Sequence, residues 1–113
     1  MSEKLVIWLG DSREAIGGFP GDVRRIAGFQ LRRVQRGLEP NDWKPMSSVG
    51  LGVQEIRIRI GAEPRVLYVA KFAGAVYVLH AFEKRTRQAP KADLDPAMRR
   101  LRALISQRTR RKE

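Results

Sequence analysis

The residues of this sequence that are best placed to do chemistry are basic. Arg57 and Arg59 alternate with isoleucines, and Arg65 opens the next apolar run. Lys84 follows the third run. Antiparallel pairing can place these four on one region of a sheet, where clustered cations repel one another unless an anion such as a phosphate lies between them. The plain alternative is an ordinary solvated face, because exposed charges are common on antiparallel sheets.

His80 is the only histidine of the chain, so no other side chain has an unperturbed pKa near neutrality. Alternation along its apolar run places it with Val76, Val78 and Phe82, which favours a packed core histidine with satisfied nitrogens. Its position near the end of that run leaves a second interpretation open, in which it orients a phosphate or transfers a proton.

Metal and nucleotide sites are disfavoured by the same inventory of residues. The chain has no cysteine and one histidine, which excludes thiolate zinc sites, cysteine nucleophiles and sites with several imidazoles. Asp93 and Asp95 are better explained by helix capping than by metal binding, because the other carboxylates are scattered. No segment has the Lys and Ser/Thr of a phosphate-binding loop. We therefore expect a site without metal or cofactor.

Hydrophobic periodicity predicts the elements that must position these residues. The first half of the chain predicts a strand over residues 5–9 that is buried on both faces, a short helical turn near 12–16 and a helix over about 20–36. Residues 38–52 contain two prolines and no periodicity, which predicts a loop.

The second half of the chain predicts a meander of antiparallel strands over residues 53–60, 65–72 and 76–82. In the first of these, isoleucines including Ile60 face the core and the charged residues face solvent. A final helix is expected over about 94–106, with Asp95 as its N-cap and Pro96 at its first position. Residues 107–113 lack an apolar anchor and are expected to form a flexible basic tail. The whole chain, residues 1–113, is therefore expected to be one α+β domain.

Charge is the strongest compositional signal in this chain of 113 residues, which carries 23 Lys and Arg against 12 Asp and Glu and a formal net charge of +11. A polyanionic partner is expected. No apolar run reaches the length of a membrane helix, and the first residues lack the basic-then-apolar order of a signal peptide. These features predict a cytoplasmic protein that does not bind membranes.

Several motifs, taken in order, form the pattern of a known family: WLGDS (8–12), FPGDVRR (19–25), WKPM (43–46), EIRIR (55–59), RVLYVAKF (65–72), VLHAFEKRT (78–86) and PKAD (90–93). The pattern resembles the phage-derived Gp49-like, HigB-type branch of the RelE toxin superfamily over roughly residues 5–105. The resemblance implies a RelE-like fold, with N-terminal helices packed on a small twisted antiparallel sheet and a C-terminal helix.

The resemblance also implies an activity and partners. Families of this kind are similar to the toxins of type II toxin–antitoxin systems, which are ribosome-dependent mRNA endoribonucleases (mRNA interferases) that inhibit translation without a metal or cofactor. The ribose 2′-hydroxyl attacks the adjacent phosphate and leaves a 2′,3′-cyclic phosphate. The implied partners are the ribosome, mRNA and a cognate antitoxin, often of the helix-turn-helix type, that blocks the basic face.

Matching positions carry the implied roles onto this chain. Arg65 is assigned to the phosphorane, Lys84 to acid or base catalysis, and Arg57 to phosphate; His80 completes the candidate catalytic set. The expected RNA-binding residues are Lys44, Arg59, Lys71, Arg85, Arg87 and Lys91. Ser47 stands where family members often have a lysine, so activity is expected to be reduced.

Two other functions are compatible with the composition. A non-catalytic basic module would bind nucleic acid through its phosphates, with an affinity that falls steeply with salt. A protein-interaction role would use the basic face to dock an acidic partner after nuclease activity has been lost. Cleavage of a translated message distinguishes the enzyme from both alternatives.

Overall fold

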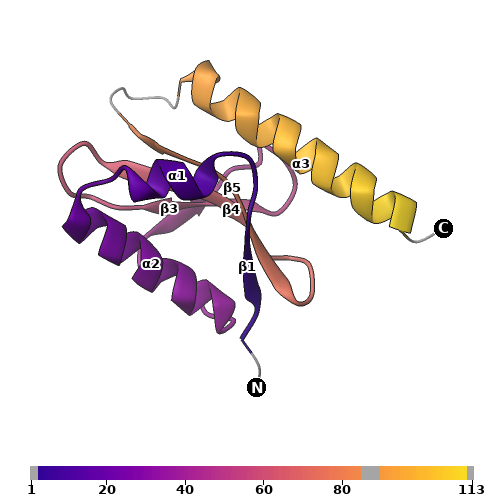
Figure 1. Cartoon of the computed structure of the whole chain (residues 1–113), viewed down its shortest axis with the longest axis horizontal. Helices are drawn as coiled ribbons and strands as arrows, with labels where there is room; N and C mark the ends of the chain where they lie inside the picture. The colour runs from indigo at the N-terminus through magenta and orange to yellow at the C-terminus, as the bar shows by residue number, and fades with distance from the viewer. Residues whose placement is uncertain (1–2, 85–89, 112–113) are drawn as a thin grey trace.

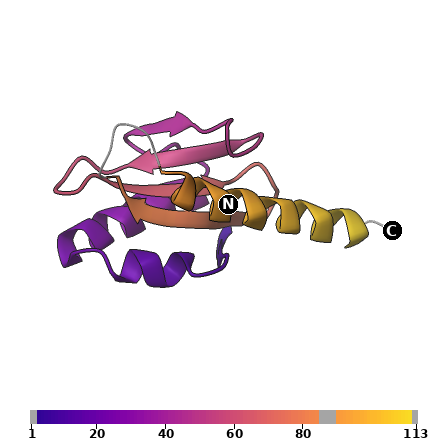
Figure 2. The same cartoon turned by 90° about the horizontal axis from the view of Figure 1, so that it is seen from above.

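A five-stranded sheet with helices on both of its faces forms the framework of the molecule (Figures 1 and 2). The computed structural model describes residues 3–84 and 90–111. The elements in chain order are β1 (Leu5–Trp8), α1 (Ser12–Gly17), α2 (Gly21–Gln35), β2 (Trp43–Pro45), β3 (Val53–Arg57), β4 (Pro64–Val69), β5 (Ala75–Glu83) and α3 (Lys91–Arg111). This is a mixed α+β fold, as the sequence predicts.

The strand order is β1-β5-β4-β3-β2. The predicted meander is present, because β3, β4 and β5 pair in antiparallel succession. β1 pairs with β5 in parallel, so the sheet is mixed rather than antiparallel. Residues 43–45, predicted as loop, form the short strand β2 beside β3. β3 ends at Arg57 and Ile60 is 44% exposed, so the predicted strand is too long and Ile60 does not join the core.

One hydrophobic core lies between the sheet and the helices α1 and α2. The helix α2 contributes an apolar stripe at helical spacing, namely Val23, Ala27, Leu31 and Val34. The sheet contributes Ile56, Ile58, Val66, Tyr68, Val76, Val78 and Ala81. The helix α2 ends close to the predicted residue 36, and Gly37 follows it with a φ of +83°, which suits glycine.

A second core lies between the opposite face of the sheet and α3. It contains Val53, Leu67, Val69, Leu79 and Phe82 from the sheet and Ala97, Leu101 and Leu104 from α3. The helix begins at Lys91 and continues to Arg111, so Asp95 is not its N-cap, Pro96 lies inside it, and residues 107–111 are helical rather than a flexible tail. Arg108 provides the missing anchor, because its guanidinium lies 4.0 Å from the centroid of the Phe72 ring.

The first strand differs from its prediction because it lies at the edge of the sheet. Val6 and Trp8 pack against the core under α2, whereas Leu5 is 68% and Ile7 36% exposed. Among the described helices, none combines the length and apolarity needed to cross a membrane.

Candidate functional site

Four basic residues gather at one end of the sheet, on the face that α3 covers elsewhere. The register places Lys44 of β2 opposite Glu55 of β3, and Arg57 of β3 opposite Arg65 of β4. Arg65 in turn lies opposite Phe82 of β5, and Lys84 follows two residues later on the same face. We call Lys44, Arg57, Arg65 and Lys84 the cationic cluster.

The carboxylate of Glu55 lies within the cationic cluster. Its Oε1 is 3.6 Å from Arg65 Nε and 4.0 Å from Lys44 Nζ. The Nη2 of Arg65 is 4.0 Å from the Glu63 carboxylate at the rim. Among the described residues, Arg57 and Lys84 have no ion pair. The four cations therefore outnumber the carboxylates that contact them.

Burial makes this arrangement unusual. Glu55 and Arg65 are each 1% exposed, although both are ionisable. Glu55 Oε1, Arg57 Nε, and Nε and Nη1 of Arg65 are buried without a hydrogen-bond partner. Buried polar groups are normally satisfied, and an unsatisfied one destabilises the fold by about 1–3 kcal/mol. A bound oxyanion would satisfy the guanidinium groups.

Electrostatics distinguish Lys84 from the arginines. Burial, and after it the positive charge of Arg65 and its cationic neighbours, lowers the pKa of Lys84 below that of an ordinary lysine. Burial also lowers the pKa of Arg65, and Glu55 opposes that shift. Arginine nevertheless remains charged in proteins. Lys84 can therefore lose its proton at a lower pH than an ordinary lysine.

His80 lies outside the cationic cluster. Its Nε2 is 2.9 Å from the Asp93 carboxylate at the start of α3, and its Nδ1 is 3.3 Å from Arg100. Its ring stacks on Phe82, with centroids 5.7 Å apart. Both nitrogens are engaged inside the fold, which matches the packed interpretation of this histidine.

The other predicted RNA-binding residues are dispersed. Arg59 is exposed at the rim and pairs with Asp42. Lys71 lies beyond the opposite end of β4, where its Nζ donates a hydrogen bond of 3.0 Å to the Leu51 carbonyl oxygen. Lys91 is exposed at the start of α3. Arg85 and Arg87 lie outside the described residues, and Ser47 is exposed just after β2.

Glu55 is the site residue that sequence reasoning missed. Alternation with isoleucines assigned its face to solvent, yet its carboxylate is buried beside Arg65. The pairing of β2 with β3 could have indicated its role, because this pairing places the ammonium of Lys44 opposite the carboxylate of Glu55. The strand β2 itself was hidden in a segment rich in proline and glycine.

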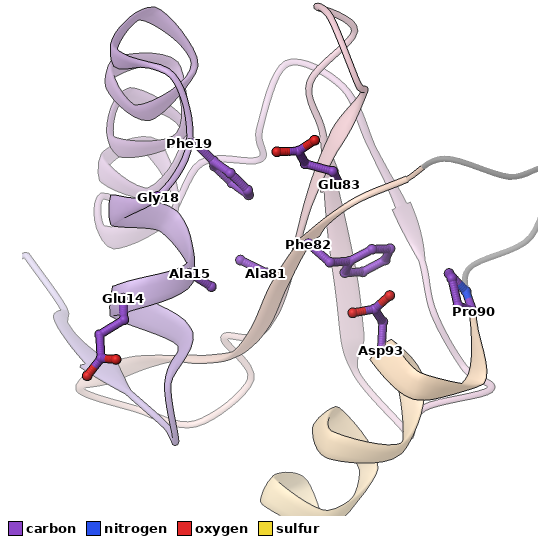
Figure 3. Close-up of a pocket in the computed structure, with 9 residues that line it drawn as sticks. All are labelled: Glu14, Ala15, Gly18, Phe19, Ala81, Phe82, Glu83, Pro90 and Asp93. Atoms are coloured by element: carbon purple, nitrogen blue, oxygen red, sulfur yellow. The ribbon is translucent and has the colours of Figure 1, made fainter.

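A cavity of about 480 Å³ lies beside this region, between α1, the end of β5 and the start of α3 (Figure 3). Phe82 lines it together with the carboxylates of Glu14, Glu83 and Asp93. A phosphate would be repelled by these three carboxylates, so the cationic cluster and not this cavity is the candidate anion site. Within the described residues, no group of three or more His, Asp or Glu could hold a metal ion.

Comparison with known proteins gives the family. A family model described as phage derived protein Gp49-like (DUF891) matches residues 14–102, a span from α1 into α3 that includes the whole cationic cluster. No individually curated protein matches the chain. The motifs and the family model agree, and the chain therefore belongs to the phage-derived Gp49-like family, the RelE/HigB-like toxin family that its sequence resembles.

Proposed function

We propose that this chain is the toxin of a type II toxin–antitoxin system, a RelE-like endoribonuclease that cleaves mRNA on the ribosome and is neutralised by a cognate antitoxin. Family membership supports the toxin assignment. The observation that carries the nuclease assignment is the cationic cluster, in which buried guanidinium nitrogens of Arg57 and Arg65 have no hydrogen-bond partner. This function would place the protein in the cytoplasm, where messages are translated.

The reaction needs stabilisation of negative charge. As the 2′ oxygen bonds to phosphorus, the bond from phosphorus to the 5′ oxygen breaks, and the products are a 2′,3′-cyclic phosphate and a 5′-hydroxyl. The pentavalent intermediate carries more negative charge than the phosphodiester, so fixed donors bind it more tightly. Arg65 suits this role because the neighbouring Glu55 and Glu63 hold a guanidinium whose Nη1 is unpaired.

The reaction also moves two protons, one from the 2′-hydroxyl and one to the 5′ oxygen. Lys84 fits proton transfer because its lowered pKa makes both its amine and its ammonium accessible nearer neutral pH. The amine would accept the first proton, or the ammonium would donate the second. Glu55 acts as a positioning residue in this scheme, since its carboxylate is buried behind Arg65 and Lys44.

The test is primer extension on a translated message after induction of the wild-type chain and of a double variant, Arg65→Ala/Lys84→Ala. We expect growth arrest and new cleavage sites with the wild type, and neither with the double variant. The matched control is Arg99→Ala/Arg102→Ala, which removes the same charge from exposed positions on α3 outside the cationic cluster and should remain toxic. Undiminished toxicity of Arg65→Ala/Lys84→Ala contradicts the assigned site. Salt-sensitive RNA binding without cleavage on ribosomes would instead identify a non-catalytic module.

A further inference from the structure

The outer face of α2 carries an exposed stripe that the proposed nuclease site does not use. Its members follow the spacing i, i+3, i+4, i+7 and i+11, which places them along one line on a helix. We call these residues the α2 stripe: Arg25, Gly28, Phe29, Arg32 and Arg36. Phe29 is 58% exposed although it is a large aromatic residue. The apolar face of the same helix is already buried against the sheet.

Gly28 in the α2 stripe has no explanation inside the fold. An added Cβ at this position would meet no atom within 4 Å. Glycine in a helix interior is less favourable than alanine, so the helix loses stability without gaining internal packing. A missing side chain at the middle of an exposed face allows another backbone to approach closely. The glycine and the neighbouring Phe29 together match the small and large residues of a helix-packing surface.

The arginines of the α2 stripe define the charge of the occupant. The Glu3 carboxylate lies 3.5 Å from Arg32 Nη2 and 3.0 Å from Arg36 Nε, and Arg36 and Arg32 lower its pKa. These two side chains are therefore already placed to share a carboxylate. Arg25, at the other end, has no ion pair within the part of the chain that the structure describes. An arginine guanidinium can bind a carboxylate through two hydrogen bonds. Arginine and aromatic residues also contribute much of the binding energy at protein interfaces.

We propose that the α2 stripe docks an acidic amphipathic helix of a partner protein, with an apolar residue against Phe29 and carboxylates on the flanking arginines. A helix is favoured over RNA because the stripe is convex and matches helix-packing spacing. Neither of the two described cavities is lined by Phe29, so neither offers it a second wall for holding a stacked base. If the proposed function holds, the partner is the antitoxin. The partner helix would then bind the outer surface of α2, on the side of the sheet opposite the cationic cluster, and leave Arg65 uncovered.

The test uses a synthetic acidic amphipathic helical peptide of about 20 residues, long enough to fold as a helix, with leucines on one face and glutamates beside them. Its dissociation constant for the full chain is measured by calorimetry. We expect Phe29→Ser and Gly28→Leu each to weaken binding about tenfold or more. Phe29→Ser should leave the thermal melt nearly unchanged because Phe29 is exposed, and Gly28→Leu should raise it slightly because leucine is the better helix former and the position has open space around it. Arg25→Glu/Arg32→Glu should abolish binding of the acidic peptide and create binding of its lysine counterpart.

The control is Arg99→Glu/Arg102→Glu, which makes the same change of charge at exposed positions on α3 and should leave peptide affinity unchanged. Equal losses in both double variants would show attraction to net charge alone and overturn the proposal. Unchanged affinity in Phe29→Ser and Gly28→Leu would also overturn it. If the α2 stripe variants lose affinity for a single-stranded RNA oligomer and the peptide does not bind, the surface is an RNA site. None of these measurements requires cleavage, so a failure of the nuclease assignment remains distinguishable.

Discussion

The two faces of the sheet are built from the same strands and do different things. Beneath α1 and α2 most buried side chains are apolar, and the buried polar ones are hydrogen-bonded. Tyr68 donates to Gln54 at 2.7 Å, Ser12 donates to the Val78 carbonyl oxygen, and Gln30 accepts from the Asn41 backbone N–H. Beneath α3 the apolar core stops short of the end of the sheet, where Glu55 and Arg65 are equally buried but unsatisfied. The face beneath α1 and α2 therefore has satisfied buried polar groups, whereas the face beneath α3 has unsatisfied ones at the cationic cluster.

This contrast separates stability from activity within a small domain. Proteins keep buried charges that weaken the fold mainly where function requires them. The α1/α2 face can supply the stability that offsets such a site. Substitutions on the two faces should therefore have different consequences for folding and for cleavage.

The largest effect is expected from Arg65→Met, which replaces the buried guanidinium by an apolar side chain of similar length. Cleavage on ribosomes should fall by roughly 10²–10³-fold, as when a fixed donor to a developing oxyanion is lost. Stability to denaturant should also fall in this single variant, because the Glu55 carboxylate is left buried without its partner. The double variant Arg65→Met/Glu55→Met, which removes both charges, should be nearly as stable as the wild type and equally inactive. The rate by primer extension and the midpoint in urea check the two parts. Large destabilisation with retained cleavage would erase the distinction between the faces.

The converse change is Leu31→Ala in the core beneath α2, where Leu31 is 3% exposed. The free energy of unfolding should fall by about 2–5 kcal/mol, because the deletion removes buried methyl groups and leaves a cavity. Cleavage per folded molecule should be unchanged. Ile105→Ala, at a position 42% exposed, is the matched control with a small effect. A loss of specific activity in Leu31→Ala would show that the faces are coupled.

Lys84→Arg tests the proton-transfer role and should lower the rate by about 10–100-fold, within the range of general acid–base catalysis. In the wild type the rate should change as Lys84 titrates, at a pH below that of an ordinary lysine, since its pKa is lowered. Arginine does not titrate, so that limb of the pH profile should disappear. The folded pKa lies below the unfolded one, so Lys84 weakens the fold at lower pH, and this effect is relieved as pH rises between the two values. An unchanged profile in the variant would remove Lys84 from proton transfer.

The smallest effect is expected at Arg108, a cation of α3 whose role is structural. Arg108→Ala should reduce the free energy of unfolding by about 0.5–1 kcal/mol through loss of the contact with Phe72. Amide exchange in the last turns of α3 should become faster while cleavage stays constant. The result would show that position at the end of the sheet, and not positive charge beneath α3 in general, defines the site.

The spacing of apolar residues along the sequence predicted those elements in which one helical or strand repeat continues over the whole element. The buried apolar side of α2 was predicted from helical spacing, and the meander of β3, β4 and β5 was predicted from runs of strand-forming residues. β2 was missed because three residues in a proline-rich segment carry no period. The edge position of β1 was missed because an apolar run does not reveal its neighbours. The C-terminal turns of α3 were missed because their anchor is a cation on Phe72.

The candidate site was predicted in part for a related reason. Arg57, Arg65 and Lys84 follow from alternation and antiparallel pairing, and the structure brings them together. Lys71, also predicted to bind RNA, lies apart from them, because six residues of extended chain separate it from Arg65 by roughly 20 Å. The burial of Glu55 depends on the tertiary arrangement of β2, β3 and β4, which no local period encodes.

The parallel pairing of β1 with β5 determines when the sheet can form as the chain is synthesised. Leu5 pairs with Ala75, so the first strand to leave the ribosome has no neighbour until most of the chain has been synthesised. Such distant contacts form slowly. Arg65 and Lys84 also come from the later strands. A nascent chain thus lacks its anion site until Lys84 has been synthesised, so under the proposed function it could not cleave a message before most of its own translation is complete.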